Sequence, residues 1–297
     1  MLLYFKGSDI VENYGTLYVV ATPIGNLNDL SNRAIDTLKN SDLILAEDTR
    51  QTIKLLNHFD IKTKMASYHK FNETKKAMET IDYLKEGKNI SLVSDAGTPC
   101  ISDPGYIIVK KCREEKINVI GIPGCSAIID ALSIGGLDTS SFSFYGFVPT
   151  ENKLKKQLFE EIKNSNIKTK VVYESPKRIV KLLNDLKNEI PDCMVSLCGE
   201  LTKIHERCIY GKIDEVYEII NNNEEYQKGE YVVLISNEVK EEKSDDTISL
   251  EAMIIDTMIK ENCSIKDAVN MLNKKCENIS KKDIYNASLN LKKITNV

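Results

Sequence analysis

The first half of the chain alternates between short apolar runs and segments with helical spacing. TLYVVAT (16–22) is rich in β-branched and apolar residues, whereas SNRAIDTLKN (31–40) repeats its apolar positions at helical intervals. The same pattern predicts strands at 16–22, 42–47, 89–94 and 117–123, and helices at 31–40, 49–58, 72–86, 105–116 and 124–134. Strands that alternate with helices through short connections predict a parallel sheet covered on both faces.

A second alternating block begins near FSFYGF. It predicts strands at 142–147, 168–174, 193–198 and 228–236, with a helix after Ser175. The segment VKEEKSDDT is charged and lacks core residues, which is typical of a linker. Beyond it the periodicity is helical only and predicts three short helices. We therefore expect an α/β protein with an N-terminal extension, two α/β domains, a linker and a helical tail, at 1–14, 15–138, 139–238, 239–247 and 248–297.

Composition narrows the class of protein. The chain has 297 residues and a net charge of −4, whereas a dedicated duplex-DNA binder is usually basic. An RNA substrate would need a local basic surface. No apolar run approaches the roughly 18 residues that span a bilayer, and the opening is too short for a signal peptide. We therefore expect a cytoplasmic protein that binds neither DNA nor membrane.

The eight cysteines form no C-x-x-C pair, and most stand in apolar stretches. We interpret them as reduced thiols that act as small hydrophobic residues. The three histidines lack the spacing of metal ligands, so no metal site is expected.

Three loops rich in small residues follow predicted strands. They are TPIGNLNDLS (22–31), LVSDAGTPCISDPG (92–105) and IPGCSAIIDA (122–131). Glycine at a strand end lets backbone N–H groups approach a ligand closely, although the same residues also simply form turns. The dinucleotide motif G-x-G-x-x-G and the P-loop are absent. Spacing alone therefore predicts an α/β enzyme that binds a small polar ligand through its backbone.

These loops also resemble a known family. The 16S ribosomal RNA (cytidine-2′-O)-methyltransferases, within the tetrapyrrole methylase superfamily, share in this order the motifs TPIGNLNDLSNRAIDTL, AEDTRQTIKLL, SYHKFNE, LVSDAGTPCISDPG, PGCSAIIDAL, FSFYGFVP, VVYESPKR and GELTK. The resemblance covers about residues 15–237. It implies the two-domain tetrapyrrole-methylase-like fold of class III methyltransferases, with S-adenosylmethionine (SAM) bent in the cleft between the domains. It also implies a homodimer, a small C-terminal helical region and 16S ribosomal RNA within the small subunit as the partner.

The resemblance further implies a set of functional residues. The cofactor would contact Pro23, Ile24, Gly25, Asp95, Ala96, Gly97, Thr98, Pro99, Ser126, Ala127 and Tyr173. Substrate binding would involve Arg50, His69 and Arg178. Lysines on the helix after FVP, and the tail with eight Lys against six acids, are further candidates for phosphate contacts.

Transfer of a methyl group to a ribose hydroxyl needs positioning and a general base. The catalytic candidates are Glu47, Glu200 and Lys203, and Glu174 is a further strand-end carboxylate. A strand-end carboxylate beside an Arg or Lys acts as a base, orients a hydroxyl or forms a structural ion pair, and the sequence leaves these roles open. His69 is another candidate, because its charge changes near neutral pH.

The chain departs from the family pattern at two positions. Lys177 stands where the family usually has His, and Gly199 where it usually has Arg. Two other functions stay open as alternatives. One is a methylase of a tetrapyrrole or other small molecule, although the first loop reads TPIGNL rather than the G-x-G-x-G-D typical of those enzymes. The other is a non-catalytic ribosome-binding relative.

Overall fold

The computed structural model describes residues 14–237, 249–275 and 280–295. They belong to two compact units, one that ends at Asn237 and one that starts at Glu238. The expected linker 239–247, and the N-terminal extension up to residue 13, lie outside the described residues.

The first unit contains a parallel sheet, as the alternating pattern predicts. Its strand order is β3-β2-β4-β1-β5, and every neighbouring pair is parallel. The strands are β1 (Thr16–Val20), β2 (Leu43–Ala46), β3 (Met65–Ser67), β4 (Ile90–Val93) and β5 (Asn118–Ile122). The central strand β4 is buried along its whole length, which fits a sequence that is apolar except for Ser91.

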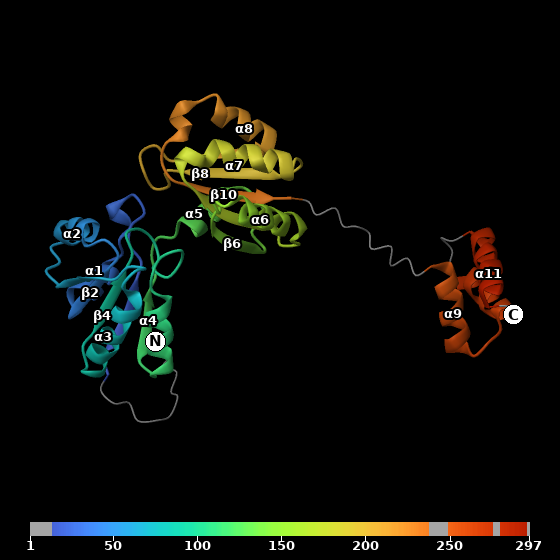
Figure 1. Cartoon of the computed structure of the whole chain (residues 1–297), viewed down its shortest axis with the longest axis horizontal. Coiled ribbons are helices and arrows are strands. Elements are labelled where there is room, and N and C mark those ends of the chain that lie inside the picture. The colour runs from blue at the N-terminus through green and yellow to red at the C-terminus, as the bar shows by residue number, and fades with distance from the viewer. Residues whose placement is uncertain (1–13, 238–248, 276–279, 296–297) are drawn as a thin grey trace. The chain divides into compact units, whose positions relative to one another are not determined.

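Helices cover both faces of this sheet (Figure 1). One core lies under α1 (Asn32–Lys39) and α2 (Thr49–His58), and the other lies under α3 (Glu73–Lys85) and α4 (Tyr106–Glu114). The helix starts follow ordinary capping chemistry, because Ser31 accepts a hydrogen bond from the Ala34 N–H, and Asp48 accepts one from the Arg50 N–H. A short 3₁₀ turn, Leu27–Asp29, follows β1.

The second sheet of this unit is mixed. Its order is β6-β7-β10-β8-β9; only β6 and β7 are parallel, and the other pairs are antiparallel. The strands are β6 (Phe142–Phe147), β7 (Thr169–Glu174), β8 (Met194–Gly199), β9 (Arg207–Lys212) and β10 (Tyr231–Ser236). The sequence analysis missed β3, β9 and the helix that follows β9.

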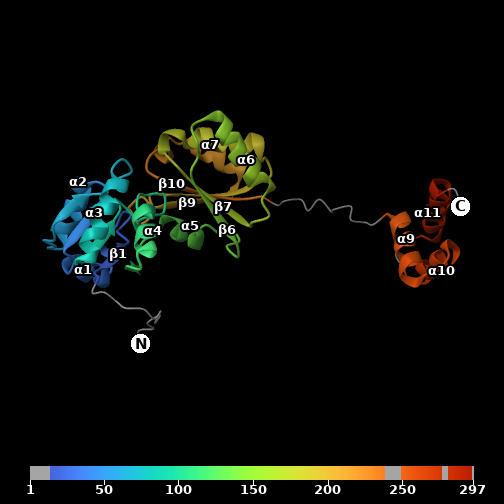
Figure 2. The same cartoon turned by 60° about the horizontal axis from the view of Figure 1, so that its bottom comes forward.

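Helices α6 (Asn152–Asn164), α7 (Pro176–Glu189) and α8 (Ile213–Asn221) share one core with this sheet, and the 3₁₀ turn Glu224–Gln227 follows α8. Figure 2 shows α6 and α7 on one side and α5 (Ala127–Ile134) on the other. Helix α5 buries Ile128, Ala131 and Leu132 against the second sheet, although the predicted boundary at residue 138 groups it with the first. That boundary stays a prediction.

The second unit consists of helices, as the tail periodicity predicts. They are α9 (Leu250–Glu261), α10 (Ile265–Lys275) and α11 (Lys281–Thr295). They enclose a small core made of Ile254, Ala268, Leu272, Ile284, Ala287 and Leu291. Within the described segments, no helix is both long and apolar enough to cross a membrane.

Candidate active site

A cavity of about 510 Å³ collects residues from both sheets of the first unit. The loops after β1, β2 and β4 and the start of α5 line it, together with the ends of β6, β7, β8 and β10. Twelve of its lining residues are among the sequence-predicted functional residues or strand-end carboxylates: Ile24, Glu47, Asp95, Ala96, Gly97, Thr98, Ser126, Ala127, Tyr173, Glu174, Glu200 and Lys203.

Backbone pairing joins the three glycine loops. Thr22 and Gly97 exchange N–H···O hydrogen bonds of 2.9 and 3.0 Å, and the Thr98 hydroxyl donates to the Cys125 carbonyl at 3.0 Å. Gly97 has φ of +81°, and a Cβ there would lie 3.4 Å from Ile24 Cγ2. A side chain at this position would therefore be strained and would crowd the first loop.

Three carboxylates stand at the first-sheet side of the cavity: Glu47, Asp95 and Asp103. Burial, followed by repulsion from Asp103 and Asp95, raises the pKa of Glu47 to about 7. Burial and then Asp95 raise the pKa of Asp103 to about 6, against an opposing hydrogen bond from Ser94. The group therefore holds a proton near neutral pH, and a cationic ligand bound beside it would favour the ionised carboxylates, with the proton released to solvent.

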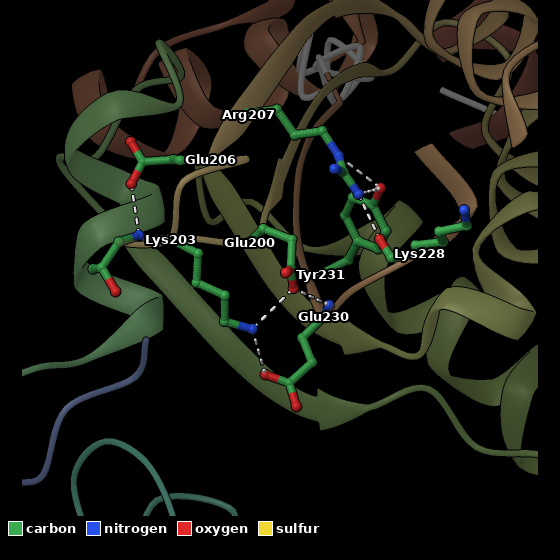
Figure 3. A network of polar contacts seen from close by, with 8 residues as sticks. Glu200, Lys203, Glu206, Arg207, Lys228, Glu230 and Tyr231 are labelled. Atoms are coloured by element: carbon green, nitrogen blue, oxygen red, sulfur yellow. Dashed lines mark hydrogen bonds and ion pairs between the residues drawn. The ribbon is translucent and has the colours of Figure 1, made fainter. Parts of the chain in front are cut away.

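The second-sheet side carries a hydrogen-bonded ion pair (Figure 3). Glu200 Oε1 accepts from Lys203 Nζ at 2.9 Å and from the backbone N–H of Glu230 at 3.1 Å. Burial opposes ionisation of Glu200, but these two hydrogen bonds outweigh it and lower its pKa. Glu200 has φ of +53°, so the loop after β8 is held in a conformation that is uncommon for a residue with a side chain.

Arg207 braces the same region from β9 (Figure 3). Its Nε donates to the Tyr231 hydroxyl at 2.9 Å, and its guanidinium also donates to the Lys228 carbonyl. The guanidinium carbon lies 5.2 Å from the Tyr231 ring centre and 5.4 Å from that of Tyr226, within range of a cation–π interaction. Tyr231 lines the cavity, so Arg207 fixes part of its wall.

Two of the residues predicted to bind substrate, Arg50 and Arg178, are paired with carboxylates. The Arg50 guanidinium makes a two-pronged contact with Asp48, at 3.0 and 2.7 Å, rather than with Glu47. Arg178 pairs with the buried Glu174 at 2.6 Å. Neither Arg50, Arg178 nor His69 lines the cavity.

Pro23, Gly25 and Pro99 are also absent from the cavity wall. A Cβ on Gly25 would lie 2.6 Å from Lys203 Cγ, so this glycine permits close contact between the first loop and the loop after β8. Gly199 stands where the family usually has Arg. The structure gives a steric reason for glycine, since a Cβ at this position would lie 2.4 Å from the Tyr231 ring. Lys177 is exposed on α7, and nothing in the structure explains its identity.

Several lining residues were missed by sequence reasoning. They are Ile101, Ser102, Asp103, Phe147, Ser175, Pro176, Leu201, Glu230, Tyr231 and Val232. Asp103 lies in the glycine-rich segment after β4. It could have been identified from the sequence as an acidic residue in a loop that follows a strand. Glu230 and Tyr231 enter because β10 pairs with β8, and a sequence carries no local signal of that pairing.

Comparison with known proteins defines the class. Residues 16–217 match the family described as Tetrapyrrole (Corrin/Porphyrin) Methylases. Among solved structures, a diphthine synthase superposes with a TM-score of 0.57 at 12% identity, covering 75% of this chain and 89% of that one. A uroporphyrin-III C-methyltransferase from Thermus thermophilus, in complex with S-adenosyl homocysteine, superposes with a TM-score of 0.51 at 16% identity, covering 76% and 98%. These likenesses concern the fold. Fold and cavity together define a methyltransferase of the tetrapyrrole methylase type.

Curated relatives narrow the class further. The protein named ribosomal RNA small subunit methyltransferase I from Halalkalibacterium halodurans is 48% identical over 75% of this chain and 76% of its own length. Relatives of the same name from Buchnera aphidicola and Bacillus subtilis are 40% and 38% identical, and each alignment covers more than nine tenths of both chains. The chain belongs to the tetrapyrrole methylase family, in the group of the small-subunit ribosomal RNA methyltransferases I.

The residues of the cavity fit SAM, which is the cofactor of this methyltransferase. Three carboxylates surround the space where a cation would bind, whereas Ile24, Ala127 and Val232 offer apolar surface to a purine ring. The Ser126 side chain does not cap α5, so backbone N–H groups of its first turn stay available to ligand oxygens.

Proposed function

We propose that the protein transfers a methyl group from SAM to the 2′-hydroxyl of a cytidine in the decoding region of 16S ribosomal RNA. The proposal rests first on the near full-length likeness to relatives named ribosomal RNA small subunit methyltransferase I, which for the Buchnera protein spans 91% of this chain and 94% of the relative. The raised pKa of Glu47, at about 7, supports it chemically.

Binding would involve the predicted cofactor residues that line the cavity. Gly97, Thr98 and Ala127 would contact the cofactor through backbone or small side chains, and Asp95 would accept a hydrogen bond from its ammonium or hydroxyl groups. When bound, SAM supplies an electrophilic methyl group on a sulfonium. The carboxylates near the cavity favour that positive charge by Coulombic attraction.

Glu47 is the best general base among the candidates. A catalytic base works best when its pKa lies near the operating pH, and burial together with Asp103 raises that of Glu47 to about 7. Its carboxylate would accept the proton of the ribose hydroxyl as the hydroxyl oxygen attacks. Glu200 is a weaker base, because Lys203 and the Glu230 N–H stabilise its ionised form.

Glu200 and Lys203 would therefore act mainly by holding the cavity wall in place rather than by transferring a proton. Their ion pair fixes the loop after β8, and Lys203 also lies 4.0 Å from Glu230 Oε2. Lys203 would contribute a positive charge at the cavity mouth, where an RNA phosphate could meet it. Arg50, His69 and Arg178 stay substrate-binding proposals, for which Arg50 would exchange Asp48 for phosphate.

The proposal extends to the assembled state and location. We infer a homodimer that acts on the small ribosomal subunit, in the cytoplasm where that subunit is assembled. Size-exclusion chromatography with light scattering at micromolar concentration should report the mass of a dimer, whereas the mass of a monomer would remove that part of the proposal.

The test is transfer of labelled methyl from SAM to small ribosomal subunits that lack the modification, with the product nucleotide mapped. The expected product is one 2′-O-methylated cytidine. Free 16S RNA and a uroporphyrinogen-type acceptor are assayed in parallel. Transfer to the tetrapyrrole alone would establish the small-molecule methylase instead. Tight SAM binding without transfer to any acceptor would favour the non-catalytic relative.

A matched pair of variants assigns the base. Glu47→Gln should lose transfer, and Glu86→Gln, an exposed change elsewhere in the first unit, should keep it. If Glu200→Gln lost far more activity than Glu47→Gln at equal SAM affinity, the roles assigned to the two carboxylates would be reversed.

A further inference from the structure

Two cysteines face each other across neighbouring strands. Cys198 on β8 and Cys208 on β9 are direct partners in the antiparallel register. Opposed Cα atoms in such a ladder lie about 4.5–5.5 Å apart, within the range that a disulfide bridges. The two Sγ atoms are 3.5 Å apart. Among the described cysteines, no other pair has its sulfur atoms in contact.

The two thiols differ in environment. Cys198 is buried and Cys208 is exposed. Burial, followed by the neighbouring Cys208, raises the pKa of Cys198 to about 12, so this thiol stays protonated. The Cys208 sulfur lies 3.2 Å from the Ser196 hydroxyl, and Cys208 as a residue is exposed to solvent. An oxidant that arrives from solvent therefore meets Cys208 first.

We propose that Cys198 and Cys208 form a reversible oxidation site, at which a hydroperoxide links the two sulfurs and thereby weakens SAM binding in the adjacent cavity. This inference goes beyond the proposed function, and its first readout does not depend on any RNA substrate.

The chemistry balances in two steps. The Cys208 sulfur attacks a peroxide oxygen, an S–O bond forms as the O–O bond breaks, and the departing oxygen takes the thiol proton and leaves as water or alcohol. The Cys198 sulfur then attacks the sulfenic sulfur of Cys208 as its thiol proton passes to the departing hydroxide. The S–S bond forms as the S–O bond breaks, and the Cys198 proton leaves with hydroxide as water. Two thiols are oxidised by two electrons, and the hydroperoxide is reduced.

The pair is joined to the cavity by its neighbours in sequence. Cys198 directly precedes Gly199 and Glu200, and Cys208 directly follows Arg207. Closing the S–S distance from 3.5 Å to about 2.05 Å turns the two side chains, and the strain that the bond introduces displaces the backbones of β8 and β9 at this position, one rung of the ladder.

Tyr231 would carry the displacement to the cavity. Gly199 lies against the Tyr231 ring. The Arg207 side chain donates a hydrogen bond to the Tyr231 hydroxyl (Figure 3). Tyr231 and Glu200 both line the cavity. Movement of this rung therefore displaces two groups of the cofactor-binding wall.

The test uses the reduced full-length protein and hydrogen peroxide. Trypsin cleaves after Lys203 and Arg207, so it places the two cysteines in separate peptides. We expect a cross-linked pair of these peptides that has lost two hydrogens and that dithiothreitol resolves. Calorimetry should show SAM affinity lowered by roughly tenfold, within the usual range of coupling between sites, and dithiothreitol should restore it.

Two variants provide the controls. Cys208→Ser changes an exposed residue and should bind SAM normally before and after peroxide. Cys263→Ser, in the second unit, should respond to peroxide as the unaltered protein does. Because this readout is SAM binding, failure of methyl transfer to RNA would not affect it.

Two outcomes would overturn the inference. One is oxidation of Cys208 to sulfinic acid with no link to Cys198, which would mean that the sulfurs do not reach each other. The other is a formed link with unchanged SAM affinity, which would mean that the rung and the cavity are not coupled.

Discussion

At the scale of single residues, Gly97 shows why the loop after β4 contains glycine. Its φ of +81° is costly for any residue with a side chain, and its neighbour Ile24 leaves little room. Both constraints arise where the first and second glycine loops pair through Thr22. The glycine therefore serves the geometry of the cavity more than the stability of the turn.

Gly97→Val should remove SAM binding while leaving a cooperative melt. We expect SAM affinity to fall by roughly a hundredfold or more. Backbone strain and steric exclusion of the cofactor together weaken binding by about 3 kcal/mol, which corresponds to that factor. Calorimetric titration with SAM measures it. Gly87→Val is the matched control, because Gly87 has a similar φ of +85° in an exposed turn after α3. Equal SAM affinity in the two variants would show that Gly97 does not face the cofactor.

Glu47 supports a prediction about the pH dependence of the reaction. Only its ionised form accepts a proton, so kcat/KM should rise with pH through about 7 and then level off. Glu47→Gln should lose about 10²–10⁴ in rate and also lose this rise. A rate profile from pH 5.5 to 8.5 on small subunits provides the measurement. If Glu47→Gln kept the same dependence of kcat/KM on pH, the group that titrates near pH 7 would not be Glu47.

The same carboxyl predicts how stability changes with pH. The folded protein raises the pKa of Glu47 from 4.5 to about 7 and that of Asp103 from 3.8 to about 6. Between these values the folded state holds protons that the unfolded chain has released. The contribution is complete below about pH 4 and is lost as the pH rises through 6 to 7.

Glu47→Gln should therefore stabilise the cofactor-free protein above pH 7. We expect a gain on the order of 1 kcal/mol, since solvent screens a half-buried group. Urea unfolding at pH 5 and pH 8 tests this. The gain should appear at pH 8 and shrink at pH 5, and the opposite order would mean that Glu47 is paired with a cation rather than crowded by carboxylates.

At the scale of elements, the β8–β9–β10 region explains what the sequence could not predict. Strand β9, RCIYGK, lacks a regular alternation of apolar and polar residues, lies at the sheet edge and is half exposed, so its pattern resembles a loop. Strand β3 has only three residues. Strands β1, β4, β7 and β10 were predicted, because each contains neighbouring apolar or β-branched residues.

The candidate site was likewise predictable only where its residues carry a local sequence signal. The glycine loops carry local signals, since Gly97 and the α5 start combine small residues with strand ends. Glu230 and Tyr231 reach the cavity only because Tyr231 pairs with Gly199 in the ladder. The pairing of Arg50 with Asp48, which leaves Glu47 unpaired by that guanidinium, depends on side-chain geometry. Long-range register and rotamers of this kind leave no trace in local composition.

Arg207 tests the role of strand β9. Arg207→Met keeps much of the side-chain volume but removes the hydrogen bonds to Tyr231 and Lys228. We expect the free energy of unfolding to fall by about 2 kcal/mol, as for hydrogen bonds to a charged group, and SAM affinity to weaken. Lys212→Met, an exposed change on the same strand, is the control. Lower stability with unchanged affinity would make Arg207 a purely structural brace.

At the scale of the whole molecule, charge sets a requirement. The chain carries a net charge of −4, and its cavity is surrounded by carboxylates, whereas RNA is a polyanion. The proposed substrate must therefore be met by local cations. Residues 249–297 contain eight Lys against six acids and belong to a separate compact unit.

Deletion of residues 249–297 should weaken action on small ribosomal subunits far more than it weakens SAM binding. The reason is that the cavity lies wholly within the first unit, which has its own cores, whereas the helical unit would supply phosphate contacts. We expect KM for subunits to rise by about tenfold at physiological salt, with SAM affinity unchanged, and the salt dependence of KM to become shallower. Lys281→Gln combined with Lys282→Gln, two exposed changes at the start of α11, should reproduce part of the effect with the unit intact.

If deletion lowered SAM affinity and activity equally, the helical unit would be part of the catalytic body. If neither changed, RNA recognition would rest on the first unit alone, and Lys203 and Arg50 would be the residues to alter next.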